Sequence, residues 1–423
     1  MKKLIKILLI LIILTFLGYF IYVNYINKVP KIQVEEEKAK ITEYHIYGNH
    51  LNITGELEVI NKDYKNINLI LYNGEEKNIE VLPTTEDKKI KFTTKESLNE
   101  GIYLDNIEKG IYYAFIKLTY EEEEKEIAKY YVLDNQTEYK TLTYYTLSKY
   151  NNSITIDTDK EYQTMYLTVK ENKNKDIYDI TIDPGHGGMD SGALIGEEKE
   201  KDYTMEISTL IKENLEKENI KVKLTHQKEE LTTNDYFDEY NTHGRAVIPN
   251  EVKSKYTLSI HCNQNNSSKM RGLEIYTPAN INYDFAKSIA ENITTYTELN
   301  YSTGQKYKVS QGIYTHNFTE SEVSSSLEGY KEKNYTPYNV TTNSNYLYMI
   351  RETGGYMTGA YVDDKNPDKV GVNPYYNSNI GNESYLLEIG YLSNKYDLEI
   401  LKNNKQEIAK AISDAIIKEL QEQ

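Results

Sequence analysis

Two histidines and two glutamates have the residue types and positions of a metal site: His186, Glu200, His261 and Glu388. His186 lies in a glycine-rich loop after the apolar run 177–182, and glycines permit the tight turns that display a side chain. Glu200 begins a stretch with helical spacing, whereas His261 and Glu388 lie near the ends of later apolar runs. Ligands of open α/β sheets bind outside the carboxyl ends of the strands. The four residues therefore predict one site there, and they suit a catalytic zinc ion.

Such a site is suited to the hydrolysis of an amide bond. Zinc with three protein ligands and one open position lowers the pKa of its bound water to about 7 and polarises a carbonyl group. The two histidines would supply neutral imidazole nitrogens, and a glutamate at the helix start would complete the site. The sequence alone leaves Glu197, Glu198 and Glu200 as candidates for that third ligand. Glu388 is then the general base that takes a proton from water and passes it to the leaving nitrogen.

The segments that carry these residues resemble, in this order, the catalytic domain of the zinc-dependent N-acetylmuramoyl-L-alanine amidases of bacterial cell walls. The resemblance rests on DPGHGGMDSG at 183–192, EKD at 200–202, SIHCN at 259–263 and LLEIGYLSN at 386–394, and it covers roughly residues 176–422. It implies that His186, Glu200 and His261 bind Zn²⁺, with Glu200 selected by the EKD motif. It also implies that Glu388 is the catalytic base and that peptidoglycan is the substrate.

The chain departs from this family pattern in two long segments, near 304–345 and 354–383, both rich in Tyr, Asn, Gly and Ser. The second precedes the run that carries Glu388, so we predict a specificity loop or lid rather than a passive surface excursion. Cys262 replaces the small residue usual after the second histidine. Because successive strand residues point to opposite faces, we expect Cys262 in the core. Three further histidines lack matching family positions and are predicted to lie on the surface: His226, His243 and His316.

Strand-like runs alternate with helical spacing over residues 176–423, the predicted catalytic domain. Helices are expected to begin near Glu200 and to cover about 245–252, 285–293 and 408–416. Alternation of this kind predicts an α/β domain with an open, twisted, mostly parallel sheet and helices on both faces.

Residues 43–175 show short alternating runs without helical spacing, and Asn73-Gly74 is a hairpin signal. This pattern predicts an all-β, immunoglobulin-like sandwich. It contains no constellation of residues for chemistry, because His45 and His50 lack suitably spaced carboxylates and are predicted to lie on the surface. The domain is a candidate for contact with a regulatory protein partner.

The N-terminus combines lysines with the uncharged apolar run 7–23, and no Ala-x-Ala-like cleavage site follows. We therefore predict an uncleaved signal anchor, a transmembrane helix at residues 1–26, rather than a cleaved signal peptide. Lysines before the run predict a single-pass protein of the cell membrane whose catalytic domain faces the wall. The polar stretch 27–42 is predicted to be a spacer. Cys262 is the only cysteine, which excludes an intrachain disulfide and a lipoprotein anchor.

Length and charge limit the function further. A chain of 423 residues suggests two or three domains, and a net charge of -16 makes a nucleic-acid partner unfavourable. The acidic run 121–126 is expected to be a solvated loop or strand edge. The sequence thus predicts a wall-facing zinc amidase that cleaves the bond between N-acetylmuramic acid and L-alanine of the stem peptide. The alternatives are a catalytically silent module that binds or regulates, and a zinc peptidase acting within the stem peptide.

Overall fold

The computed structural model describes residues 32–58, 63–86, 88–134, 141–227, 244–332, 340–354 and 380–421. The predicted anchor at residues 1–26 lies outside this set. Within it, no helix is both long and apolar enough to span a membrane. The longest helices, α2 (Glu200–Lys217) and α9 (Lys405–Gln421), carry charged side chains along their length. The prediction of a single-pass location in the cell membrane is therefore contradicted, and we withdraw it.

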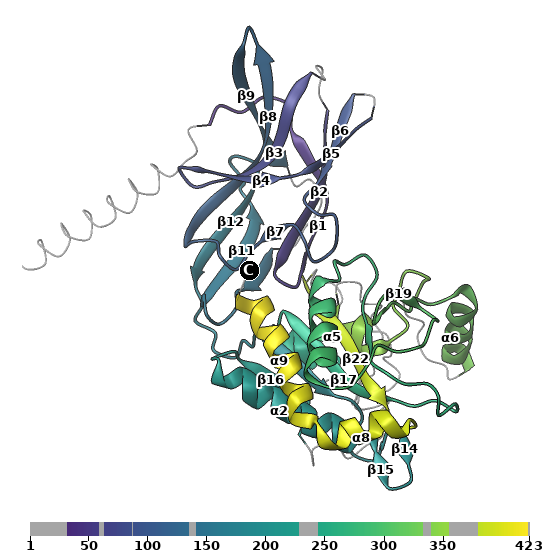
Figure 1. The fold of residues 1–423 in the computed structure, drawn as a ribbon. Helices are drawn as coiled ribbons and strands as arrows, with labels where there is room; N and C mark the ends of the chain where they lie inside the picture. The colour runs from purple at the N-terminus through teal and green to yellow at the C-terminus, as the bar shows by residue number, and fades with distance from the viewer. Residues whose placement is uncertain are drawn as a thin grey trace, which may run out of the picture.

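The N-terminal half, as described, is built from strands (Figure 1). These are β1 (Ala39–Tyr47), β2 (His50–Glu58), β3 (Tyr64–Tyr72), β4 (Glu76–Glu80), β5 (Leu82–Glu86), β6 (Lys89–Thr93), β7 (Ile102–Tyr103), β8 (Gly110–Glu122), β9 (Lys125–Asp134), β10 (Leu142–Tyr145), β11 (Asn152–Thr158) and β12 (Met165–Glu171). One layer contains β8 with β3 and β12, the other contains β1 with β2 and β6, and β9 pairs with both β8 and β1. Apolar side chains from both layers form a single core. An immunoglobulin-like topology stays a prediction.

Local signals in this half correspond to turns in the structure. Asn73-Gly74 connects β3 to its antiparallel partner β4, as predicted. The acidic run forms the exposed tip of the β8–β9 hairpin, where Glu123 and Glu124 have left-handed φ angles of 50° and 62°. The predicted spacer 27–42 is wrong at its C-terminal end. Ala39 begins β1 and is buried because it pairs with β2 and contributes to the core.

The C-terminal half contains a seven-stranded sheet in the order β16-β13-β17-β22-β18-β20-β19. Its strands are β13 (Ile180–Pro184), β16 (Val222–Leu224), β17 (Tyr256–Asn263), β18 (Glu274–Tyr276), β19 (Lys308–Ser310), β20 (Ile313–Tyr314) and β22 (Glu383–Tyr391). The other elements are the hairpin β14 (Leu194–Ile195) and β15 (Glu198–Lys199), α4 (Ile248–Glu251), α5 (Asp284–Tyr296), α6 (Glu320–Glu332), α7 (Tyr348–Thr353), β21 (Ile380–Gly381) and α8 (Lys395–Asn403). Strands β16, β13, β17 and β22 are parallel, whereas β18 is antiparallel to β22. The predicted α/β architecture is confirmed.

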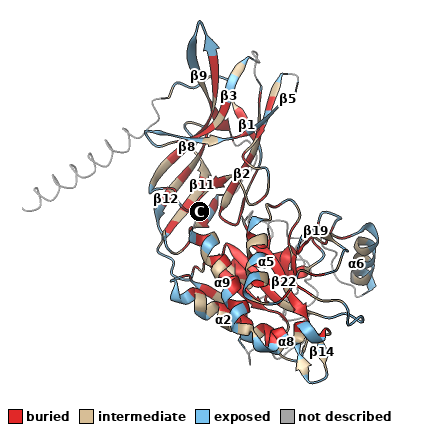
Figure 2. Cartoon of the chain, viewed as in Figure 1, coloured by how far each residue is buried: buried red, intermediate tan, exposed pale blue. Residues whose placement is uncertain are grey.

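The two faces of this sheet differ in function: one packs into the apolar core, and the other carries a residue of the candidate site. Along β22, Leu387 and Ile389 enter the large core that α2, α5 and α9 cover, and Figure 2 shows this interior as buried. Leu386 and Glu388 face the opposite side, because neighbouring strand residues alternate. The short helix α7 packs on that side. Helix α4 is shorter than the predicted 245–252, because residues 245–247 form a turn before it and the chain turns again at Lys253 with a φ of 57°.

The two predicted insertions are partly built into the fold. Residues 304–345 include β19 and β20, which extend the sheet, and α6. Of 354–383, residues 355–379 lie outside the described chain, so the predicted lid lies there too. The part that follows is β21, which pairs in parallel with β1 of the N-terminal half. Tyr47 and Leu98 of that half pack into the core of the C-terminal half, so the two halves share an interior.

A buried carboxyl group at this junction predicts how stability depends on pH. Glu383 accepts hydrogen bonds from the Asn99 amide, at 2.9 Å, and from the Tyr385 hydroxyl. Burial raises the pKa of Glu383 from 4.5 to about 8. Folding then takes up a proton between these two values, so the free energy of unfolding should fall as pH rises from 4.5 to 8, by on the order of 4 kcal/mol. Glu383→Gln keeps an oxygen acceptor and should flatten this slope. Urea unfolding of both proteins at pH 5 to 8 measures it, and parallel slopes would contradict the assignment.

Candidate metal centre

Three side chains from different elements converge at the carboxyl edge of the sheet. His186 follows β13 in a turn where its own φ is 65°, an unusual angle for a residue with a side chain. Glu200 is the first residue of α2, and His261 lies near the end of β17. One ligand atom from each of the three lies within 4.8 Å of the others.

The carboxylate of Glu200 lies between the two imidazoles. Its Oε2 is 3.1 Å from Nε2 of His186, and its Oε1 is 3.0 Å from Nδ1 of His261. The backbone N–H groups of Ala193 and Cys262 donate to the two oxygens at 2.8 and 2.9 Å, which fixes the orientation of the carboxylate. The two rings are nearly perpendicular, with centroids 4.8 Å apart. The structure thus brings together the three residues that the sequence proposed.

This donor set fits a zinc ion. Two His nitrogens and one Glu oxygen are a known catalytic ligand set, and ligands of a tetrahedral zinc lie roughly 3.4 Å apart. The other ring nitrogen of His186, Nδ1, is 2.5 Å from Asp190 Oδ2. A carboxylate on the second nitrogen is the usual support of a metal-bound histidine, because it leaves Nε2 for the metal. The role of these residues as ligands stays a prediction.

Glu388 lies beside this group. It is paired with His261 across β17 and β22, and both line a cavity of about 500 Å³ with His186 and Glu200. Its Oε2 is shielded from solvent and has no hydrogen-bond partner among the described residues. A buried carboxylate oxygen without a partner is costly, and a cation or a substrate proton in the cavity would relieve that cost.

Burial and charge set the protonation of the site. Burial alone would lower the pKa of His186, but the carboxylates of Glu200 and Asp190 outweigh it and raise that pKa to about 9. Burial and the charges of Glu200 and Glu274 raise the pKa of Glu388 well above its usual value. A divalent cation among these groups would oppose both shifts, since it replaces the proton on the imidazole and stabilises the carboxylate.

Several supporting residues were not assigned from the sequence. Asp183, at the end of β13, is fully buried and accepts from Arg245 Nε at 2.8 Å and from Ser259 Oγ at 2.6 Å. Glu274 lies opposite Glu388 in the antiparallel pair and accepts from the Tyr391 hydroxyl at 2.7 Å. Asp183 could have been found from the sequence, because it lies inside the DPGHGG motif. The contacts of Arg245 and Glu274 depend on packing between distant parts of the chain, which no local pattern indicates.

Other predictions about titratable residues have mixed outcomes. Cys262 is buried in the core, as alternation predicted, and burial raises the pKa of its thiol. The predicted surface positions of His226 and His316 are wrong. His226 is buried beside Thr225, and His316 is stacked between two tyrosine rings. His45 and His50 are half-buried, and His243 lies outside the described residues. Glu197 and Glu198, the alternative ligands, do not belong to the metal-ligand group.

Gly185 leaves room for the ring of His261, which gives a testable prediction. A Cβ added at Gly185 would lie 2.4 to 2.6 Å from three atoms of that ring. Gly185→Ala should therefore displace His261 and weaken zinc binding by at least about tenfold, comparable to loss of a supporting contact. Competition with a chelating dye measures the affinity. Gly329→Ala, where an added Cβ meets nothing within 4 Å, is the matched control. Equal affinities in both variants would refute this close approach.

Comparison with known families gives an independent finding. A family model described as N-acetylmuramoyl-L-alanine amidase matches residues 180–418, more than half of the 423-residue chain. Within the match lie all four residues of the candidate site. The chain is also similar to a protein named "Probable cell wall amidase LytH" of Staphylococcus saprophyticus, with 36% identity over 118 residues, 26% of this chain and 36% of that protein.

A second relative is the germination-specific N-acetylmuramoyl-L-alanine amidase of Bacillus subtilis, 29% identical over 143 residues, 32% of this chain and 59% of that protein. The chain thus spans less than two thirds of these relatives. Among solved structures, the catalytic domain of the amidase CwlV from Bacillus (Paenibacillus) polymyxa var. colistinus has a TM-score of 0.38 at 20% identity, covering 58% of this chain and 98% of that one. The amidase CwlD from Clostridioides difficile, in complex with the lipoprotein GerS, has a TM-score of 0.37 at 20% identity, covering 58% and 100%.

Proposed function

The chain belongs to the N-acetylmuramoyl-L-alanine amidase family, and from this we propose that it hydrolyses the amide bond between N-acetylmuramic acid and L-alanine of the peptidoglycan stem peptide. We assign His186, Glu200 and His261 to zinc binding and Glu388 to general-base catalysis. The observation that carries the proposal is the convergence of three ligand atoms within 4.8 Å beside a shielded, unpartnered Glu388 oxygen.

Each residue has a separate task in this mechanism. His186, Glu200 and His261 would hold a zinc ion, which would supply polarisation of the scissile carbonyl and a lowered pKa, about 7, for a bound water molecule. Asp190 accepts a hydrogen bond from the Nδ1–H group of His186, and the backbone N–H groups of Ala193 and Cys262 hold Glu200 in place. Glu388 takes the proton of the attacking water at its carboxylate and delivers it to the leaving nitrogen of L-alanine.

The surroundings of the site favour a peptide-bearing substrate. Leu347, Tyr348 and Met349 line the 500 Å³ cavity together with the polar group. An apolar wall next to a few convergent polar groups is typical of a ligand-binding site, because the polar groups fix the orientation of the bound molecule. With the substrate in the cell wall, this half of the chain would act outside the cytoplasm.

Product analysis tests the proposal. The full chain is purified, its zinc content is measured, and it is incubated with peptidoglycan whose soluble products are identified by mass spectrometry. Release of intact stem peptides, with sugars lacking them, is the expected result. Shortened stems would instead identify a peptidase acting within the stem, and an absence of products would identify a silent binding or regulatory module.

The division of the chain at residues 175 and 176 remains our proposal. A regulatory protein partner that contacts the β half is likewise our proposal, and it rests on the sequence-based prediction alone. The acidic net charge supports a substrate other than nucleic acid.

A further inference from the structure

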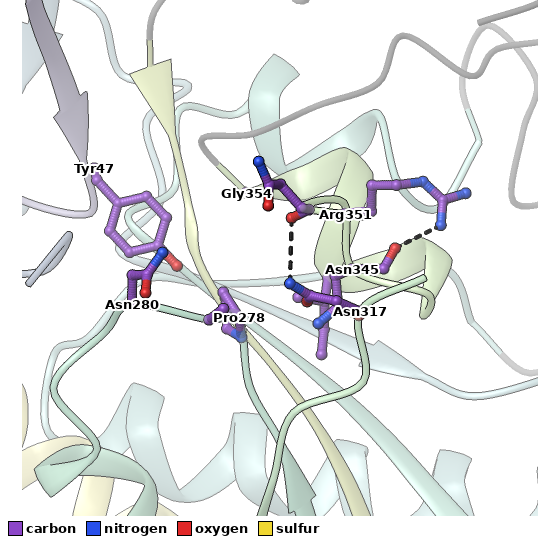
Figure 3. A pocket seen from close by; sticks show the side chains of 10 residues that line it. Tyr47, Pro278, Asn280, Asn317, Asn345, Arg351 and Gly354 are labelled. Carbon is purple, nitrogen blue, oxygen red and sulfur yellow. Dashed lines mark hydrogen bonds between the residues drawn. The ribbon is translucent and has the colours of Figure 1, made fainter. Parts of the chain in front are cut away.

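A second cavity lies where the two halves meet, at the far end of α7 from the metal site. Tyr348 and Met349 of α7 line the metal-site cavity, whereas Ile350 and Arg351 line the second one. The second cavity has a volume of about 190 Å³. Figure 3 shows Tyr47, from β1 of the N-terminal half, on one side and residues of the C-terminal half on the other. The N-terminal half therefore contributes one residue, Tyr47, to the lining of this cavity.

Asparagine is the most frequent residue type in the lining of this cavity, with Asn280, Asn317, Asn343 and Asn345. Two of them come from antiparallel segments that the first family departure contributes. Asn317 and Asn345 form an isolated bridge, and the Tyr346 N–H donates to the His316 carbonyl at 2.7 Å. Because side chains alternate along such a pair, the carboxamides face the cavity and the aromatic rings face the other way.

The aromatic side of this pair is rigid. The ring of His316 is stacked between Tyr307, at a centroid distance of 3.6 Å, and Tyr346, at 4.3 Å. Phe318 packs against Tyr346 with centroids 5.1 Å apart. This stack holds the two segments in position, so the carboxamides on the cavity side are presented on a preformed surface.

One of these carboxamides, that of Asn317, has a hydrogen-bond acceptor without a partner among the described residues. Both ends of the Asn345 carboxamide have a partner, since it donates to the Thr277 carbonyl at 3.1 Å and accepts from the Leu347 N–H at 2.9 Å. Asn317 donates to the Asn343 carbonyl at 3.4 Å, but its Oδ1 is shielded from solvent and has no partner among the described residues. Leaving such an acceptor unpaired costs about 1–3 kcal/mol, which a ligand donor in the cavity would recover.

The charge balance of the cavity selects the ligand class. The guanidinium of Arg351 is neutralised by Glu352, 3.0 Å from its Nε, and donates to the carbonyls of Asn345 and Tyr346. What remains for a ligand is a set of neutral amides that both donate and accept, beside the tyrosine ring of Tyr47. Such a surface matches a ligand rich in hydroxyl and acetamido groups, and the described lining residues offer no free charge to an ion.

We propose that this cavity is a subsite for an N-acetylated hexose of the glycan strand, placed beyond α7 from the metal site. The proposal rests on the proposed function, because the N-acetylmuramic acid whose amide is cleaved has further acetamido sugars on both sides of it along the glycan strand, and such a strand would reach both cavities. The N-terminal half then contributes to the subsite through Tyr47.

A sugar oligomer without a stem peptide tests this subsite independently of catalysis. The N-acetylglucosamine tetramer is titrated into the full chain by isothermal calorimetry, where we expect saturable binding. Asn317→Leu removes the unpaired acceptor and Asn343→Leu, at an exposed position, alters the rim with little risk to folding. Each should weaken binding about tenfold, the effect of losing roughly one hydrogen bond. Asn300→Leu, on an exposed asparagine remote from the lining, should bind as the wild type does.

The outcomes separate the two proposals. No binding of the tetramer by the wild type, or unchanged binding by both lining variants, overturns the subsite. A chain that releases stem peptides but shows either result keeps its amidase function and loses only the subsite. A chain that binds the tetramer through Asn317 and releases no product keeps the subsite and loses the amidase function.

Discussion

Replacing Glu388 by glutamine is expected to lower turnover on peptidoglycan by about 10²–10⁴-fold while leaving the zinc content unchanged, because the amide cannot accept the proton of the attacking water. Glutamine has nearly the same shape, and Glu388 belongs to the cavity but not to the group of three ligand atoms. Its Oε2 makes no hydrogen bond to the described residues, so the substitution breaks no contact of that oxygen. Stem-peptide release measures turnover, and elemental analysis measures zinc.

The matched control is Glu291→Gln, at an exposed position of α5 on the far side of the core. It makes the same change of charge and should leave both quantities as they are in the wild type. A Glu388→Gln protein with full turnover would remove the general base from the mechanism. A protein that loses zinc as well would show instead that Glu388 holds the metal.

Local sequence patterns were sufficient for the parts of the site that strand geometry controls. The alternation in β17 places His261 toward the site and Cys262 in the core, as two-residue periodicity requires. Glu200 begins α2, as the helical spacing predicted. The choice among three nearby glutamates could not be made from spacing, because it depends on the direction in which the β14–β15 hairpin returns the chain to the helix.

Contacts between residues far apart in the chain could not be predicted. The buried pair of Asp183 and Arg245 joins the end of β13 to a turn before α4, and no local pattern indicates that partnership. His316 was assigned to the surface because it has no matching family position, yet the rings of Tyr307 and Tyr346 enclose its ring. Likewise, β21 pairs with β1 from the opposite end of the chain. Single-sequence periodicity reports which side of an element is buried, but not which element covers it.

Loss of a metal ligand is the second large effect that we expect. Three variants should differ in zinc affinity according to how directly the replaced residue contacts the ion. His186→Ala removes one of three ligands and should abolish stoichiometric zinc binding, weakening affinity by more than about 100-fold. Asp190→Asn leaves the ligand but alters the support of its ring, so a loss of about 10–100-fold is expected. His45→Ala, in the N-terminal half, should bind zinc normally. Dialysis against a chelator followed by elemental analysis gives the order. If His186→Ala retained one zinc per chain while His45→Ala lost it, the ion would belong to another site, and the short distances among His186, Glu200 and His261 would reflect ion pairing alone.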